Sequence, residues 1–100
     1  MTDVASRLRQ CAPLFHALGD PARQEIILLL AQHERLTVGA VAEQLTVSRP
    51  TVSHHLKVLV QAGIVGVEKV ARERFHFLTI DTCLNKIETL YQAARTDFST

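Results

Sequence analysis

This chain of 100 residues has few cysteines and no long apolar run, and so lacks the marks of disulfide-rich and membrane proteins. Its two cysteines, Cys11 and Cys83, are too few for a disulfide framework and too far apart for a zinc finger. No apolar run approaches the length of a membrane-spanning helix, and residues 1–10 contain no signal-peptide core. A composition of 47% hydrophobic and 21% charged residues also argues against disorder. We therefore expect one folded domain, residues 1–100, located in the cytoplasm and without a membrane partner.

The residue combinations that usually carry catalysis are missing as well. The chain has no glycine-rich phosphate-binding loop, no Ser-His-Asp combination and no paired acids. His16, His33 and His76 are isolated, and His54 and His55 have no cysteine or carboxylate at a zinc-binding spacing. These absences predict a protein that is not an enzyme and that holds no cofactor or metal ion.

What the chain does contain is one long amphipathic helix, predicted between Leu45 and Gly63 after a turn. Ser48 is a good N-cap because its hydroxyl can accept from a backbone N–H of the first turn. Pro50 lies inside that turn, where its missing N–H costs nothing, and Gly63 suits the left-handed position that closes a helix. Apolar residues recur at helical spacing and form one stripe: Val52, Leu56, Leu59 and Val60.

The other faces of this helix carry hydrogen-bond donors and cations, and no carboxylate occurs between Ser48 and Val67. A helix of this kind suits the major groove of DNA, although an ordinary surface helix is the alternative. One of His54 and His55 should face DNA and the other the protein body. The candidate DNA-binding residues of the helix are Ser48, Arg49, Thr51, Ser53, His54 and Lys57.

Positive charge is concentrated around the same segment, although the whole chain has a net charge of only +1. Residues 48–74 contain five Lys or Arg and two Glu, for a net charge of +3, whereas residues 1–47 and 75–100 each have a net charge of −1. A local excess of cations is expected of a surface that contacts phosphates.

Two helices are predicted in the first third of the chain. One covers Val4–Leu18, and Pro13 should kink or split it, with a break expected near Ala12. Asp20 then caps a second helix, which begins with a proline and covers residues 21–32. This second helix is apolar over most of its surface, so we expect it at the centre of the core.

A third helix, residues 38–45 with Thr37 as its N-cap, is joined to the long helix by a turn too short for anything else. Helix, short turn and helix make the helix-turn-helix arrangement. A last helix should begin with Asp81 as its cap and end near Phe98. Its stripe is Leu84, Ile87, Leu90, Tyr91, Ala94 and Phe98.

Between the long helix and the last one, the residue pattern is that of β-strands. Ile64–Val70 and Arg74–Ile80 are rich in β-branched or aromatic residues, with residues 71–73 between them. The resulting hairpin would be a wing, whose Arg72 and Arg74 can contact the DNA backbone. The predicted fold is therefore mainly α with a β-hairpin wing, in the order α-α-α-α-β-β-α.

Three segments carry a resemblance to a known family. FHALGDPARQEIILLL, LTVGAVAEQLTVSRPTVSHHLKVLVQAGIV and RERFHFL resemble the winged helix-turn-helix repressors of the arsenic- and metal-responsive ArsR/SmtB family, from Phe15 to about Ile80. The resemblance implies a homodimer formed through the first and last helices, residues 1–18 and 81–98. It also implies binding to an inverted-repeat operator in double-stranded DNA, repression of transcription, and release by an inducer.

The chain departs from the family at its known sensing sites. One site type needs a Cys-x-Cys pair where this chain has Val38 to Val41. Another needs two histidines, and the matching positions here are Cys83 and Ala94, between the carboxylates Asp81 and Asp97. We therefore expect no metal site of either type. The wing also lacks the usual glycine, which suggests a longer or less tight turn.

Two questions stay open at the level of sequence. Cys11 and Cys83 each lie on the apolar stripe of an expected dimerisation helix, where they are either small packing residues or a thiol sensor for an inducer that the sequence does not identify. The same fold could also serve as a protein-interaction module without DNA binding. The exposed cations favour DNA, because a protein-binding face would show more aromatic residues or methionine.

Overall fold

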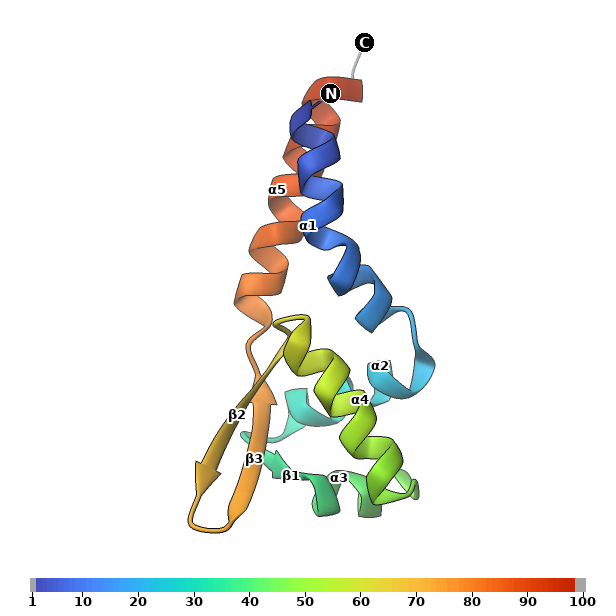
Figure 1. Ribbon diagram of the computed structural model, residues 1–100, viewed down its shortest axis with the longest axis vertical. Coiled ribbons are helices and arrows are strands. Elements are labelled where there is room, and N and C mark those ends of the chain that lie inside the picture. Colours follow the sequence, from blue (N-terminus) through green and yellow to red (C-terminus); the bar gives the residue numbers. More distant parts are fainter. Residues whose placement is uncertain (1, 99–100) are drawn as a thin grey trace.

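The computed structural model describes residues 2–98, and Figure 1 shows the arrangement of its elements. The predicted order of helices and hairpin strands is confirmed, with one short strand added before the third helix. The elements are α1 (Thr2–Leu18), α2 (Pro21–Gln32), β1 (Leu36–Thr37), α3 (Val38–Leu45), α4 (Arg49–Gln61), β2 (Val65–Val70), β3 (Glu73–Leu78) and α5 (Ile80–Phe98).

The molecule is elongated, measuring 52 × 25 × 20 Å, because α1 and α5 pack side by side and extend away from the rest of the chain (Figure 1). The core lies where the last turns of α1 and the start of α5 meet the other helices and the base of the hairpin. Within residues 2–98, no helix is both long enough and apolar enough to cross a membrane. The largest fully buried core side chains are Leu14, Ile26, Val41, Val52, Leu56, Leu59 and Ile64.

Side chains cap three helices as the sequence predicts. A carboxylate oxygen of Asp20 accepts from the backbone N–H of Arg23 (3.0 Å), and the hydroxyl of Thr37 accepts from Ala40 (3.2 Å). The hydroxyl of Ser48 accepts from the backbone N–H of Thr51 at the start of α4. Each cap satisfies a backbone donor that has no partner inside its helix.

The end of α4 is also as predicted. Gly63 has φ +80°, and its N–H donates to the carbonyl of Val60 (3.0 Å) while that of Ile64 donates to Leu59 (3.0 Å). This pair of bonds is a Schellman motif, which requires the left-handed conformation that glycine adopts without a Cβ penalty. The motif turns the chain directly from α4 into the hairpin.

The expected break near Ala12 is wrong, because α1 is one continuous helix through Pro13. The proline lacks the N–H that would bond to the carbonyl of Arg9, but Arg9, Ala12 and Pro13 are all exposed, so that carbonyl can be hydrated. Figure 1 shows the lower part of α1 turning away from α5. The proline thus bends the helix without ending it.

The last helix starts two residues earlier than expected, because Asp81 as its N-cap would make residue 82 the first helical residue. It begins at Ile80, which places Asp81 in its first turn instead of at the N-cap. A carboxylate in the first turn still favours the helix dipole. The preceding Thr79 is bonded elsewhere, since its hydroxyl donates to the carbonyl of Gly63 (2.9 Å).

The two hairpin strands, β2 and β3, form an antiparallel sheet with β1, in the order β1-β3-β2. Val70 pairs with Glu73, so the turn between β2 and β3 contains only Ala71 and Arg72. The expectation of a longer or less tight turn is therefore wrong. Without glycine, the backbone of this turn is strained, because Ala71 has φ +57°. That conformation favours glycine at this place in a two-residue turn.

We predict that Ala71→Gly stabilises the wing. Removing the methyl group relieves the left-handed strain and should raise the free energy of unfolding by up to about 1 kcal/mol. Chemical denaturation measures this change. Ala31→Gly, at an exposed position of α2, is the control and should lower stability by up to about 1 kcal/mol. Destabilisation by both substitutions would show that the turn at Ala71 is not strained.

Candidate nucleic-acid interface

The packing of α4 decides which of its side chains remain available. Val52, Leu56 and Leu59 are buried against the core, as their spacing predicts. The candidate residues of α4 and of its N-cap are all exposed: Ser48, Arg49, Thr51, Ser53, His54 and Lys57. A turn of three residues joins α3 to α4, in which Thr46 has φ +51°. The helix-turn-helix therefore presents one polar face of α4.

The start of α4 is organised by its cap and by Arg49. The hydroxyls of Ser48 and Thr51 lie 2.8 Å apart, so these two side chains are bonded to each other. The guanidinium of Arg49 lies over the first turn of α3, where a Cβ added to Gly39 would be only 2.7 Å from its Nη2. Arg49 also lines a cavity of about 250 Å³ together with Arg74 of the wing. It therefore points toward the wing side of α4.

The strand alternation separates charges on the wing. Lys69 pairs with Arg74, and Val67 pairs with His76, so these four side chains share one face of the hairpin. Val67, Arg74 and His76 line a cavity of about 360 Å³ with residues of α4, so this face is turned toward α4. The opposite face carries Glu68 next to Phe75. The wing thus presents cations to α4 and Glu68 to the other side, while Glu73 at the start of β3 lines the smaller cavity with Arg49 and Arg74.

The cavity between α4 and the wing forms a groove with a polar mouth. Ser53, Lys57 and Gln61 contribute from α4, and Arg74 contributes from β3. None of the described residues that line it is acidic. Below the mouth, burial lowers the pKa of His76, which the backbone of Leu36 partly opposes, so the imidazole is neutral near pH 7. The groove can therefore accept an anionic backbone without an opposing charge.

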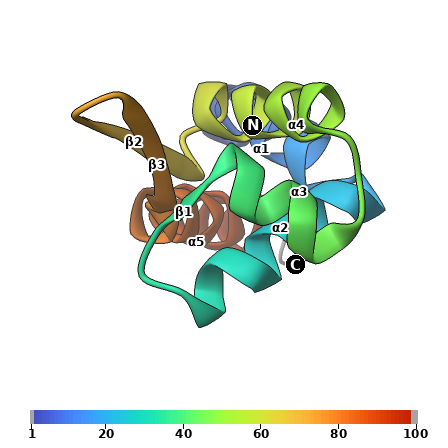
Figure 2. The ribbon, with the colours of Figure 1, turned by 90° about the horizontal axis from the view of Figure 1, so that it is seen from below.

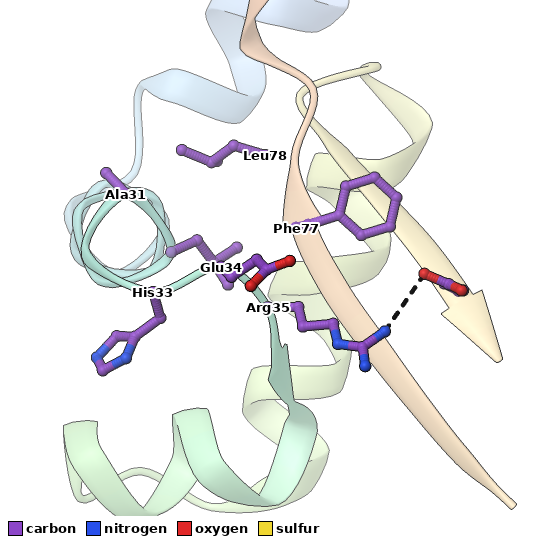
Figure 3. A pocket seen from close by; sticks show the side chains of 8 residues that line it. Ala31, His33, Glu34, Arg35, Phe77 and Leu78 are labelled. Atoms are coloured by element: carbon purple, nitrogen blue, oxygen red, sulfur yellow. Dashed lines mark hydrogen bonds and ion pairs between the residues drawn. The ribbon is translucent and has the colours of Figure 1, made fainter. Parts of the chain in front are cut away.

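The far face of the hairpin is used for anchoring, as Figure 3 shows. Nη1 of Arg35 lies 3.5 Å from a carboxylate oxygen of Glu68, and its guanidinium lies 4.6 Å from the ring centroid of Phe75. These contacts border a cavity of about 460 Å³ between the end of α2 and the sheet. Arg35 is thus a cation that holds the wing to the protein body and faces away from the groove.

The wing tip and the two histidines complete the surface. Arg72 is exposed at the tip, and Figure 2 shows the hairpin projecting to one side of the helices. His54 is exposed, whereas His55 is half-buried with its Nδ1 3.3 Å from Nη1 of Arg23. His55 is therefore the histidine that faces the protein body, and contact of His54 with DNA stays a prediction.

Two residues of this surface were missed at the level of sequence. Lys69 lies opposite Arg74 on the α4-facing side of the wing, and Gln61 lines the groove one helical turn after Lys57. Both could have been found from periodicity: Lys69 from the alternation of β2 and Gln61 from the i, i+4 spacing of α4. The groove side of the interface is therefore larger than predicted.

The two cysteines lie elsewhere, where α1 packs against α5. Each is only 1% exposed, and the thiol of Cys11 donates to the carbonyl of Lys86 (3.5 Å). Burial raises the pKa of the Cys83 thiol, and the neighbouring Cys11 raises it further while Lys86 opposes the shift. Both cysteines are therefore buried within one protomer, where α1 packs against α5. Phe15, four residues after Cys11 on α1, is 46% exposed.

The comparison with known proteins agrees with this geometry. The profile of a helix-turn-helix domain family matches residues 18–68, which include α2, α3 and α4. The biofilm growth-associated repressor of Agrobacterium fabrum is 38% identical over 88 residues, which cover 88% of this chain and 74% of the relative. A solved ArsR-like transcriptional regulator from Rhodococcus has a TM-score of 0.79 at 28% identity. The match covers 88% of this chain and 82% of that one.

The chain belongs to the ArsR family of winged helix-turn-helix transcriptional regulators. A further solved ArsR-family candidate, the homodimeric winged helix-turn-helix DNA-binding domain from Mycobacterium bovis, is 25% identical with a TM-score of 0.73. That match covers 91% of this chain and 84% of the other. Within residues 2–98, no group of three or more His, Cys, Asp or Glu could hold a metal ion.

We predict that the two faces of the wing differ in their effect on DNA affinity. Arg74→Gln and Lys69→Gln should each weaken binding similarly on all sequences and reduce the slope of log affinity against log salt by about one, as expected for one lost phosphate contact. Fluorescence anisotropy over a salt series measures the slope. Arg35→Gln is the matched control on the far face and should leave it unchanged. A changed sequence preference, or an equal loss from all three variants, would contradict the assignment.

Proposed function

We propose that this protein is a homodimeric transcriptional repressor that binds an inverted-repeat operator in double-stranded DNA. The observation that carries the proposal is the cationic groove between α4 and the wing, which has no acidic residue in its described lining. An α-helix of this width fits the major groove, and a wing beside it reaches the adjacent backbone. That the bound protein represses transcription is inferred from its similarity to the Agrobacterium repressor.

The position of each side chain suggests its role on DNA. Thr51, Ser53 and His54 lie nearest the base edges, whereas Ser48 and Arg49, at the helix start, lie where flanking phosphates would pass. The remaining phosphate contacts come from Lys57, Arg72 and Arg74, with Lys69 added by the strand register. A protein-interaction module is less well supported, because the exposed chemistry of the groove mouth is cationic and not aromatic.

A second copy of the chain is the proposed partner of the α1–α5 surface. Leu8 and Phe15 are about half exposed and seven residues apart on α1. Leu84, Tyr91 and Phe98 of α5 are 52–59% exposed and also recur every seven residues. Heptad spacing is that of helices that pack along a shared seam. We therefore assign residues 1–18 and 81–98 to dimerisation, and a structural neighbour with this fold is itself homodimeric.

We further propose that residues 1–100 act as one DNA-binding domain in the cytoplasm and that the protein is not an enzyme. The family consists of transcription regulators, and the polar side chains of the groove are accounted for by DNA contacts. A dimer with α4 in successive major grooves would place the half-sites about one helical turn apart, roughly 34–36 Å.

We predict that Leu84→Glu disrupts the dimer. A carboxylate on the apolar seam would be buried without a partner, so sedimentation should show a monomer at micromolar concentration. Affinity for an operator selected from random DNA should fall about 100-fold or more, because the two half-sites no longer bind as one unit. Leu28→Glu is the matched control, since Leu28 is 58% exposed on α2, away from the seam. Equal sedimentation of the two variants would contradict the proposed interface, and failure of the wild type to select any DNA would contradict the proposed function.

The inducer that releases DNA is proposed to act through Cys11 and Cys83. The supporting observation is that both thiols are buried where α1 packs against α5, the two proposed dimerisation helices. An oxidant such as diamide would take two electrons and two protons from them, forming one disulfide while diamide becomes the hydrazine. Because both thiols are buried and that of Cys83 has a raised pKa, the reaction should be slow.

We predict that diamide releases the wild type from its operator slowly and leaves a Cys11→Ser, Cys83→Ser double variant bound. Gel shifts over a time course measure the release, and mass spectrometry of the wild type should show the loss of two hydrogens. The thermal midpoint of the double variant serves as the control for folding. Equal release of both proteins would leave the cysteines as packing residues.

A further inference from the structure

Arg23 of α2 is a buried cation that connects three helices. Its side chain is only 7% exposed. Nε donates to the carbonyl of Ala17 (2.8 Å), Nη2 donates to the carbonyl of His16 (3.0 Å), and Nη1 lies 3.3 Å from Nδ1 of His55. The guanidinium therefore spans from the end of α1, across α2, to the middle of α4.

The contacts to α1 satisfy backbone groups that the helix itself cannot. The last carbonyls of a helix have no intrahelical donor, and a cation there also complements the helix dipole. The planar guanidinium reaches two of these carbonyls at once because its N–H donors diverge in a fixed fork. Arg23 thus fixes its own position relative to the end of α1.

The contact to α4 has a defined direction. Arginine has donors only, so Nδ1 of His55 must be the acceptor and carries no proton in this contact. Asp20 lies beside the pair, with a carboxylate oxygen 4.0 Å from the same Nδ1, and also accepts from the backbone N–H of Arg23. His55 is half-buried and does not line the groove, although its ring centroid lies 5.9 Å from that of the exposed His54. His55 therefore faces the protein body from the middle of α4, whose opposite face is the proposed DNA-reading surface.

We propose that Arg23 and His55 are positioning residues that fix the angle between α1 and α4, and through it the spacing of half-sites that the dimer accepts. The inference rests on the proposed function, because α1 belongs to the proposed dimer surface and α4 to the proposed reading surface. In a two-fold dimer, the separation of the two recognition helices sets the half-site spacing. The hydrogen bonds from Arg23 to α1 and to His55 of α4 would hold that separation at one value.

The test uses two substitutions at His55, because they leave the bonds from Arg23 to α1 intact. His55→Gln keeps an acceptor, the amide oxygen, whereas His55→Leu removes it at similar size. The DNA is an inverted repeat selected from a random pool with the wild type, plus versions with one base pair inserted or removed at its centre, and a single half-site. Fluorescence anisotropy gives the affinity for each, and thermal unfolding confirms that the variants are folded.

The wild type should prefer the selected spacing by on the order of tenfold, comparable to the effect of a mismatched base pair. His55→Leu should lose most of that preference while binding the single half-site as the wild type does, and His55→Gln should retain it. Preserved spacing preference in His55→Leu, or equal behaviour of both variants, would overturn the inference. A loss of half-site affinity equal to the loss on the repeat would assign His55 to DNA contact instead.

A measurement without DNA separates failure of this inference from failure of the proposed function. Residual dipolar couplings of the free protein report the relative orientation of α1 and α4. His55→Leu should change that orientation and His55→Gln should not. If the wild type selected no DNA but the couplings changed as expected, the positioning role would stand and the repressor function would fall. Unchanged couplings in His55→Leu would overturn the positioning role itself.

Discussion

The structure depends on the burial of one side of α4 against the core, because every other feature of the interface is placed relative to that helix. Val52, Leu56 and Leu59 hold it in position, while Ser48 starts it and Gly63 ends it with defined hydrogen bonds. A helix held on one side and at both ends has little freedom to rotate. Its opposite face can therefore present polar side chains in a fixed arrangement.

The wing extends this surface through a separation of charge that follows from strand geometry. Lys69 and Arg74 share the face toward α4, whereas Glu68 and Phe75 hold Arg35 on the other. Alternation alone places Lys69 and Arg74 on the face toward the groove and Glu68 on the opposite face. Since the chain as a whole is nearly neutral, with a net charge of +1, this local arrangement and not the total charge supports DNA binding.

The helices and most of the interface could be predicted because their signals are local. Caps such as Asp20, apolar spacing, and the cations of α4 are all visible within one or two helical turns. What could not be predicted depends on partners distant in sequence or on strain: the pairing that makes β1, the left-handed Ala71, and the bond between Arg23 and His55 across 32 positions. The break expected near Ala12 does not occur, because exposure, which no local pattern gives, decides whether the carbonyl freed by Pro13 can be hydrated.

The central claim is that α4 enters the major groove with the wing along the adjacent backbone, twice in one symmetric complex. Hydroxyl-radical footprinting on the selected operator tests this most directly, because it reports protection of each sugar along both strands. Two protected patches per strand, on one face of the duplex and about 10 base pairs apart, are predicted. Protection spread evenly along the DNA, or confined to a single patch, would contradict the claim.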